Sequence, residues 1–168
     1  GHPDPAHRSS PTTSQMGQDV LIWRNYFSAL TVRKEIGYYV DSGANDATWG
    51  SNTWFYDHCL GWKGLCVEAQ LKYWHRLRMH RSCKLIKKCI GAEHKNMTWN
   101  GIGAKAGLSL ERGTRAKGVR VECSPLHSML QTAAADGQQL IGGRDGKPAE
   151  VTFWSLDIEG AELLVLNA

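Results

Sequence analysis

The chain alternates short apolar segments with longer segments of helical composition, and this alternation restricts the folds open to it. Strands are expected at residues 37–41, 64–68, 84–90, 119–123 and 151–157. These segments are largely apolar, rather than apolar at every second position, which is typical of strands buried on both faces of a sheet. The pattern therefore predicts an α/β fold in which a doubly wound, mainly parallel sheet is flanked by helices.

Helices are expected between these strands, at residues 20–30, 51–60, 71–81 and 125–134, with a last one that begins at Glu159 or Gly160. The segment 91–118 is rich in Gly, Lys and polar residues, which indicates loops with a hairpin-like excursion. Residues 136–148 form a second Gly-rich segment, for which a loop is expected. Because the first residues are polar and rich in Pro, we expect a flexible tail over 1–13, ahead of one domain over 14–168.

Composition argues against a membrane-spanning protein and against a typical nucleic-acid-binding protein. The 168 residues are 42% hydrophobic and 21% charged, which suits an ordinary globular domain with a buried core. No apolar run approaches the roughly 20 residues that cross a bilayer, so no membrane span is expected. The formal charge of +4 is spread along the chain and does not form the dense basic stripe of a nucleic-acid partner.

The cysteine pattern gives no metal site. Five cysteines without CxxC spacing argue against both a zinc site and a complete disulfide framework. Cys66 and Cys89 lie in apolar, strand-like segments, so we interpret them as buried thiols that behave as small hydrophobic groups. One or two disulfides are the alternative if the protein is secreted.

The loop after the first expected strand has the composition of a ligand-binding turn. Ligands of open α/β sheets bind at the carboxyl ends of the strands, where Asp41, Gly43 and Asn45 follow the first strand. Gly43 has no side chain, so a ligand can approach the backbone closely. The backbone amides around Thr48–Thr53 could hold a carboxylate or a phosphate. A tight turn without a ligand is the alternative interpretation.

Acidic residues at the ends of three strands indicate the kind of ligand. Glu68 ends the second strand, where a carboxylate can accept hydrogen bonds from both ribose hydroxyls of a nucleoside. Asp157 and Glu159 follow the last strand at the same rim, together with Asp41. Carboxylates repel the phosphates of NAD and ATP but attract the positive charges of S-adenosylmethionine. The GxGxxG sequence of dinucleotide folds is absent, which also favours a nucleoside without pyrophosphate.

These blocks resemble the motifs of the FkbM family of methyltransferases. The resemblance lies in GYYVDSGAND (37–46) with the SNT that follows at 51–53, in LGWKGLCVE (60–68), in LDIEGAE (156–162) and in the lead-in SQMGQD (14–19). The blocks occur in family order. Two departures are the Ala-Gln pair after Glu68 and a chain that ends where the family's remaining strands would begin.

The resemblance implies a Rossmann-like fold, S-adenosylmethionine as methyl donor, and O-methylation of a sugar or small-molecule acceptor. It further implies a role for each motif residue. Asp41, Gly43 and Asn45 would line the methionine end of the cofactor, Glu68 would hold the ribose, and Ser51 would also bind the cofactor. Ala92 would lie in the segment beside the adenine, with Asp157 and Glu159 as catalytic residues nearest the methyl group and the acceptor. Asp157 is the first candidate for the base that removes the hydroxyl proton, with His94 and His127 as further candidates. No metal is expected.

Two other functions remain open at this level. The chain could bind the cofactor and yet lack a complete acceptor site, in which case it would be an inactive methyltransferase-like domain. It could also bind RNA through its seven tryptophans and its basic segments. Trp62 and Trp154 argue against RNA binding, because both fall in segments expected to be buried.

Overall fold

The computed structural model describes residues 12–100, 107–110, 118–135 and 150–167. The helices are α1 (Gln18–Ile22), the π-helical turn η2 (Trp23–Phe27), α2 (Ser28–Val32), α3 (Trp54–His58), α4 (Leu71–His80), α5 (Leu126–Ala135) and α6 (Glu162–Leu166). The strands are β1 (Tyr38–Ser42), β2 (Lys63–Val67), β3 (Lys84–Ile86), β4 (Cys89–Ile90), β5 (Lys95–Asn100), β6 (Gly107–Leu110), β7 (Val119–Ser124) and β8 (Phe153–Leu156).

A four-stranded parallel sheet in the order β3-β2-β1-β8 forms the centre of the molecule. The expectation of an α/β fold with a mainly parallel sheet is thereby confirmed. The chain runs outward from β1 to β2 and β3, and it later returns to place β8 on the other side of β1. The strand order therefore reverses between β1 and β8, and in open α/β sheets this reversal is where ligands bind.

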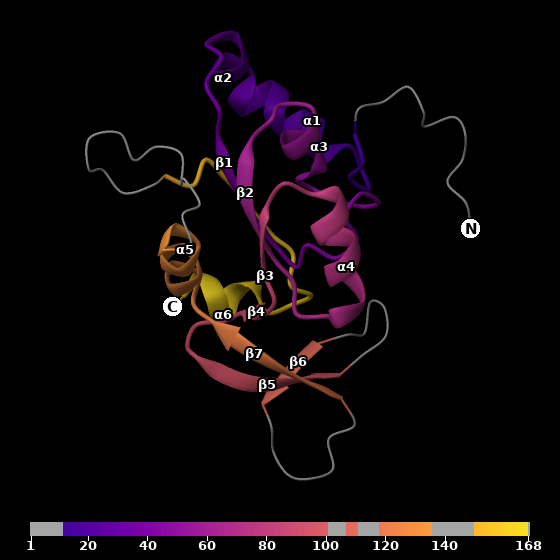
Figure 1. Cartoon of the computed structure of the whole chain (residues 1–168), viewed down its shortest axis with the longest axis vertical. Helices are drawn as coiled ribbons and strands as arrows, with labels where there is room; N and C mark the ends of the chain where they lie inside the picture. The colour runs from indigo at the N-terminus through magenta and orange to yellow at the C-terminus, as the bar shows by residue number, and fades with distance from the viewer. Residues whose placement is uncertain (1–11, 101–106, 111–117, 136–149, 168) are drawn as a thin grey trace.

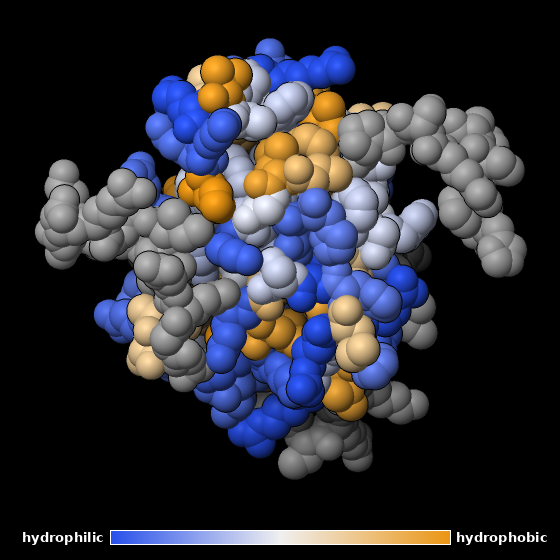
Figure 2. All heavy atoms as spheres, turned by 45° about the horizontal axis from the view of Figure 1, so that its top comes forward, coloured by the Kyte–Doolittle hydropathy of each residue, from blue (hydrophilic) through white to orange (hydrophobic). Residues whose placement is uncertain are grey.

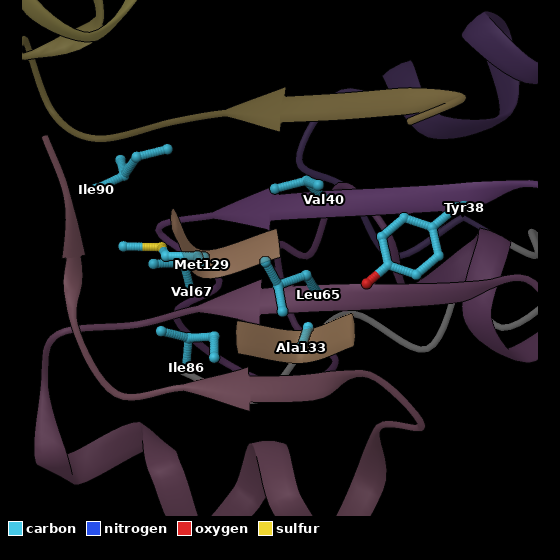
Figure 3. Packing of buried hydrophobic residues seen from close by; sticks show 8 residues of the cluster. All are labelled: Tyr38, Val40, Leu65, Val67, Ile86, Ile90, Met129 and Ala133. Carbon is cyan, nitrogen blue, oxygen red and sulfur yellow. The ribbon is translucent and has the colours of Figure 1, made fainter. Parts of the chain in front are cut away.

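Helices cover both faces of this sheet (Figure 1). Successive side chains of a strand point to opposite faces, so Tyr38 and Val40 lie in one core and Tyr39 in the other. The first core receives α5, whose Met129 and Ala133 pack against the strand side chains (Figure 3). The second core receives the N-terminal helices, α3 and α4. The sheet is thus buried on both sides, as its apolar strands predicted.

A second sheet in the order β4-β7-β5-β6 lies beyond the end of β3. The single strand expected at 84–90 is wrong: β3 ends at Ile86, and β4 pairs with β7 in the second sheet. Lys87 and Lys88 lie between them, and their charges are kept near the surface where the chain changes sheets. The hairpin-like excursion is confirmed as the antiparallel pair β5 and β6, and the strand expected at 119–123 is β7.

The interpretation of Cys66 and Cys89 as free buried thiols is wrong, and the structure has the two disulfides that the alternative allowed. Cys66 is bonded to Cys83, and Cys89 to Cys123, whereas Cys59 is a free and exposed thiol. The first bridge joins β2 to the residue before β3, and the second joins β4 to β7 at directly paired positions. Because the partners are brought together by sheet pairing, their spacing along the chain carried no signal.

Helix positions agree with expectation better than helix starts do. The helix expected at 51–60 begins at Trp54, and the last helix begins at Glu162 rather than at Glu159 or Gly160. The Gly-rich loop expected at 136–148 lies outside the described residues. Within the described residues, no helix is both long and apolar enough to cross a membrane. Hydrophobic groups are interspersed with hydrophilic ones on the face seen in Figure 2.

Candidate functional site

A cavity of about 250 Å³ opens at the carboxyl ends of the parallel strands. Its walls are the loop after β1, the residues after β2, the β3–β4 connection and the turn after β8. It therefore occupies the point at which the strand order reverses. The volume lies somewhat below the range for small-molecule pockets, which begins at about 300 Å³.

Most of the residues singled out from the sequence line this cavity. They are Asp41, Gly43, Asn45, Ser51, Glu68, Asp157 and Glu159. Ala92 does not line the cavity. In the segment that was expected beside the adenine, Cys89 and Ile90 line the cavity instead. The alternative bases His94 and His127 do not line the cavity either, and His94 lies instead between the hydroxyls of Ser124 and Ser128.

The loops that follow β1 and β8 lie so close together that only glycine fits at position 43. Its φ of +76° lies in the left-handed region, and a Cβ there would lie 2.0 Å from the carbonyl oxygen of Asp157. No side chain can be accommodated at that distance from a backbone atom. Its amide donates to the carbonyl of Val67 at 3.0 Å. Gly43 thus holds the ends of β1, β2 and β8 together around the cavity.

Glu68 is a buried carboxylate that faces the cavity. One oxygen accepts the amide of Asn45 at 2.7 Å, and the other accepts the amide of Gln70 at 2.6 Å. The residue is 4% exposed. Burial raises the pKa of the Glu68 carboxyl, and the two backbone hydrogen bonds partly oppose that rise. Since each carboxylate oxygen has two lone pairs, both oxygens retain the capacity to accept a hydroxyl.

Asp41 belongs to a buried polar network centred on Arg81. The hydroxyl of Thr53 donates to Asp41 at 2.5 Å, and Nη1 of Arg81 lies 3.7 Å from the same carboxylate oxygen. Burial raises the pKa of Asp41, and the charge of Arg81 and the Thr53 hydrogen bond oppose this. Nη1 of Arg81 also donates to the hydroxyl of Ser51 at 3.0 Å. The network fixes the loop that forms one wall of the cavity.

Arg81 was not among the site residues predicted from the sequence. It is the last residue of the helix expected at 71–81, where no role was predicted for it, yet its side chain is fully buried and pairs with Asp57 at 2.7 Å. Burial by itself would raise the pKa of Asp57, but hydrogen bonds from Ser82 and Arg81 hold it below its usual range. The only sequence signal was that two acids lie in segments expected to be buried, which requires a buried cation to compensate them.

The turn after β8 presents two carboxylates to the cavity. Asp157 and Glu159 are both exposed, and neither forms a salt bridge with another described residue. Glu159 has a φ of +56°, a left-handed conformation that is unfavourable for Glu. The side chain of Glu162 accepts the amides of Ile158 and Gly160 and so secures the turn. Glu162 therefore helps to shape the site by holding this turn.

Replacing Glu159 by Gly tests whether the turn stores strain. Gly adopts the left-handed region without a steric penalty, so we expect Glu159→Gly to raise the free energy of unfolding by up to about 1 kcal/mol. Glu159→Ala keeps the Cβ and removes the carboxylate, so it should give no such gain. Urea denaturation of the three proteins measures the difference. A glycine variant that is less stable than the alanine variant would contradict the account.

The N-terminal segment contributes Gln15 to the wall of the cavity. Asp19 is fully buried and accepts the hydroxyl of Ser14 at 2.7 Å. The hydroxyl of Thr13 donates to the carbonyl of Ser51 at 3.1 Å, and this brings Gln15 to the cavity. The lead-in block at 14–19 is therefore part of the site, whereas the sequence assigned roles only to residues after β1.

Lysines contribute the remaining charge of the site. Lys72 and Lys88 line the cavity, and Lys88 pairs with Glu122 at 2.5 Å.

No group of three His, Cys, Asp or Glu side chains among the described residues is arranged to hold a metal ion. Comparison of the chain with protein-family models, with curated proteins and with solved structures gave no match.

Proposed function

We propose that this chain is the cofactor-binding part of a Rossmann-like, S-adenosylmethionine-dependent methyltransferase of the FkbM type, which methylates a hydroxyl of a sugar or small molecule. The observation that carries the proposal is one cavity, at the reversal of the strand order, that brings together Asp41, Glu68, Asp157 and Glu159. The sequence had assigned these four carboxylates to one rim.

The residues of the cavity are compatible with the cofactor. Glu68 is buried, faces the cavity and can still accept two hydroxyls, which is what a ribose offers. The carboxylates of Asp157 and Glu159 have no salt-bridge partner among the described residues, and they would attract a ligand with ammonium and sulfonium charges. Cys89 and Ile90 offer an apolar wall suited to a base.

In the proposed reaction, S-adenosylmethionine supplies an electrophilic methyl group. The chain's own contribution is to orient the ligand through Glu68 and the Gly43 loop, and to bring a base to the acceptor hydroxyl. Asp157 is the first candidate base, because its carboxylate is exposed, lines the cavity and forms no salt bridge with another described residue. Glu159 is the second candidate, held toward the site by its unusual backbone.

The alternative is a domain that binds the cofactor without turnover. The cavity volume of about 250 Å³ favours this reading, since cofactor and acceptor together need more space. Retention of both Asp157 and Glu159 at the rim favours an enzyme.

Methyl transfer from labelled S-adenosylmethionine to a panel of sugars and small alcohols separates the two. We expect label in at least one acceptor, and its loss in Asp157→Asn, which keeps the shape of the side chain but cannot act as a base. His94→Gln, outside the cavity, serves as the control and should retain transfer. Cofactor binding without transfer to any acceptor would instead identify an inactive domain.

A further inference from the structure

The rim of the cavity carries an exposed tryptophan that has no role in either core. Trp49 lines the cavity and is 70% exposed. Among the described residues, it is the one large exposed hydrophobic side chain that also lines this cavity. Trp62, by contrast, is buried in the second core, and Trp154 is half-buried and donates to the hydroxyl of Ser42. The exposure of Trp49 therefore calls for a reason other than packing.

The backbone that presents Trp49 is held from several directions. The carboxylate of Asp46 accepts the amides of Thr48 and Trp49, each at 3.0 Å, and Asp46 also pairs with Arg76. The amide of Gly50 donates to the carbonyl of Thr13 at 2.9 Å. An exposed ring on a fixed backbone loses little conformational freedom when a ligand covers it. Such an arrangement favours ligand contact over a flexible surface residue.

Polar side chains line the same cavity as Trp49, among them Gln15 and Asn52. Gln15 lies against Gly50, the residue after Trp49, and a Cβ on Gly50 would lie 3.9 Å from its amide nitrogen. Asn52 donates to the hydroxyl of Ser155 at 3.1 Å, which ties this loop to the strand that ends at the catalytic candidates. The cavity that the indole lines thus also carries side-chain amides, carboxylates and two lysines, Lys72 and Lys88.

This combination selects among acceptor chemistries. A sugar ring has an apolar C–H face that covers an indole, and hydroxyls at its edge that amides and carboxylates bind. Asp157 and Glu159 would repel an anionic acceptor. A flat hydrocarbon acceptor would bury these polar groups without partners, which costs about 1–3 kcal/mol for each group.

From these contacts we infer that Trp49 is the stacking platform for a neutral carbohydrate ring that carries the acceptor hydroxyl. The inference rests on the proposed function and deepens it, because it names the acceptor class and a residue that selects it. Trp49 acts by stacking on the ring, and Gln15 by binding its hydroxyls.

Saturation-transfer NMR tests the inference without requiring turnover. The probes are the methyl glycosides of glucose, galactose, mannose and fucose, added to the whole chain saturated with S-adenosylhomocysteine. We expect saturation transfer to the ring protons of at least one glycoside, its loss in Trp49→Ala and partial retention in Trp49→Phe. Tyr26→Ala, which removes an exposed aromatic ring outside the cavity, is the matched control and should behave as the unaltered chain.

Calorimetry with S-adenosylhomocysteine separates the failure of this inference from failure of the proposed function. Trp49→Ala should bind that ligand within about twofold of the unaltered chain; a loss of tenfold or more, about 1.4 kcal/mol, would place the indole on the cofactor and overturn the inference. Undiminished glycoside contacts in Trp49→Ala, or no glycoside contacts in the unaltered chain, would overturn this inference alone. An unaltered chain that binds no S-adenosylhomocysteine would overturn both proposals.

Discussion

Replacing Arg81 by Met should lower the free energy of unfolding by about 3–5 kcal/mol, because the substitution leaves buried carboxylates without a cation. Arg81 is fully buried, and its guanidinium lies 2.7 Å from Asp57 and 3.7 Å from Asp41. Methionine fills a similar volume, so the loss reflects charge and hydrogen bonding more than a cavity. Urea denaturation followed by circular dichroism measures the change.

Arg76 provides the matched control for this substitution. Its salt bridge to Asp46 is 3.4 Å long, but its side chain is 55% exposed. Exposed pairs contribute about 0–1 kcal/mol, so Arg76→Met should have a small effect. Equal losses in the two variants would contradict the central place given to Arg81.

The free energy of unfolding measured as a function of pH tests the role of Arg81 in a second way. The pKa of Asp57 is held below its usual range by hydrogen bonds from Ser82 and Arg81, which outweigh burial. A carboxyl with a lowered folded pKa stabilises the protein above its unfolded pKa, and this contribution is lost as pH falls through the folded pKa. The difference in the free energy of unfolding between the unaltered chain and Arg81→Met should therefore become smaller as the pH is lowered. A difference that widens as pH falls would be inconsistent with the network.

The strand pattern predicted the α/β sheet because buried parallel strands leave a strong signal in apolar runs. The same local signal failed at 84–90, where a single run contains β3 and β4 from different sheets. No property of Lys87 or Lys88 alone shows that the chain changes partner there. Pairing is decided by β7, which lies far along the sequence. The disulfide between Cys89 and Cys123 depends on that same pairing.

Some residues of the candidate site could be predicted from the sequence, and others could not. Residues at strand ends, such as Glu68 and Asp157, were found because the end of a buried strand fixes their position at the rim. Arg81 and Trp49 were missed, since burial or exposure of one residue near a helix end or in a loop depends on contacts that are distant in the sequence. Gln15 lies in the lead-in motif at 14–19, but no expected strand adjoins that motif, so its position at the cavity could not be predicted.

The central claim is that the cavity binds S-adenosylmethionine through Glu68. Hydrogen bonds to a charged group contribute about 1.5–3 kcal/mol each, so loss of those to a ribose should weaken binding tenfold or more. Glu68→Ala removes both acceptors, and Glu68→Gln keeps the size of the side chain. Glu93→Gln, an exposed acid that does not line the cavity, is the control.

The measurement that tests this claim most directly is calorimetric titration of the chain with S-adenosylmethionine and S-adenosylhomocysteine, repeated on the three variants. The account predicts saturable binding by the unaltered chain and by Glu93→Gln, and binding weakened tenfold or more in both Glu68 variants. Circular dichroism should show all four proteins folded. Absence of binding to the folded, unaltered chain, or equal affinity in the Glu68 variants, would contradict the assignment of this cavity to the cofactor.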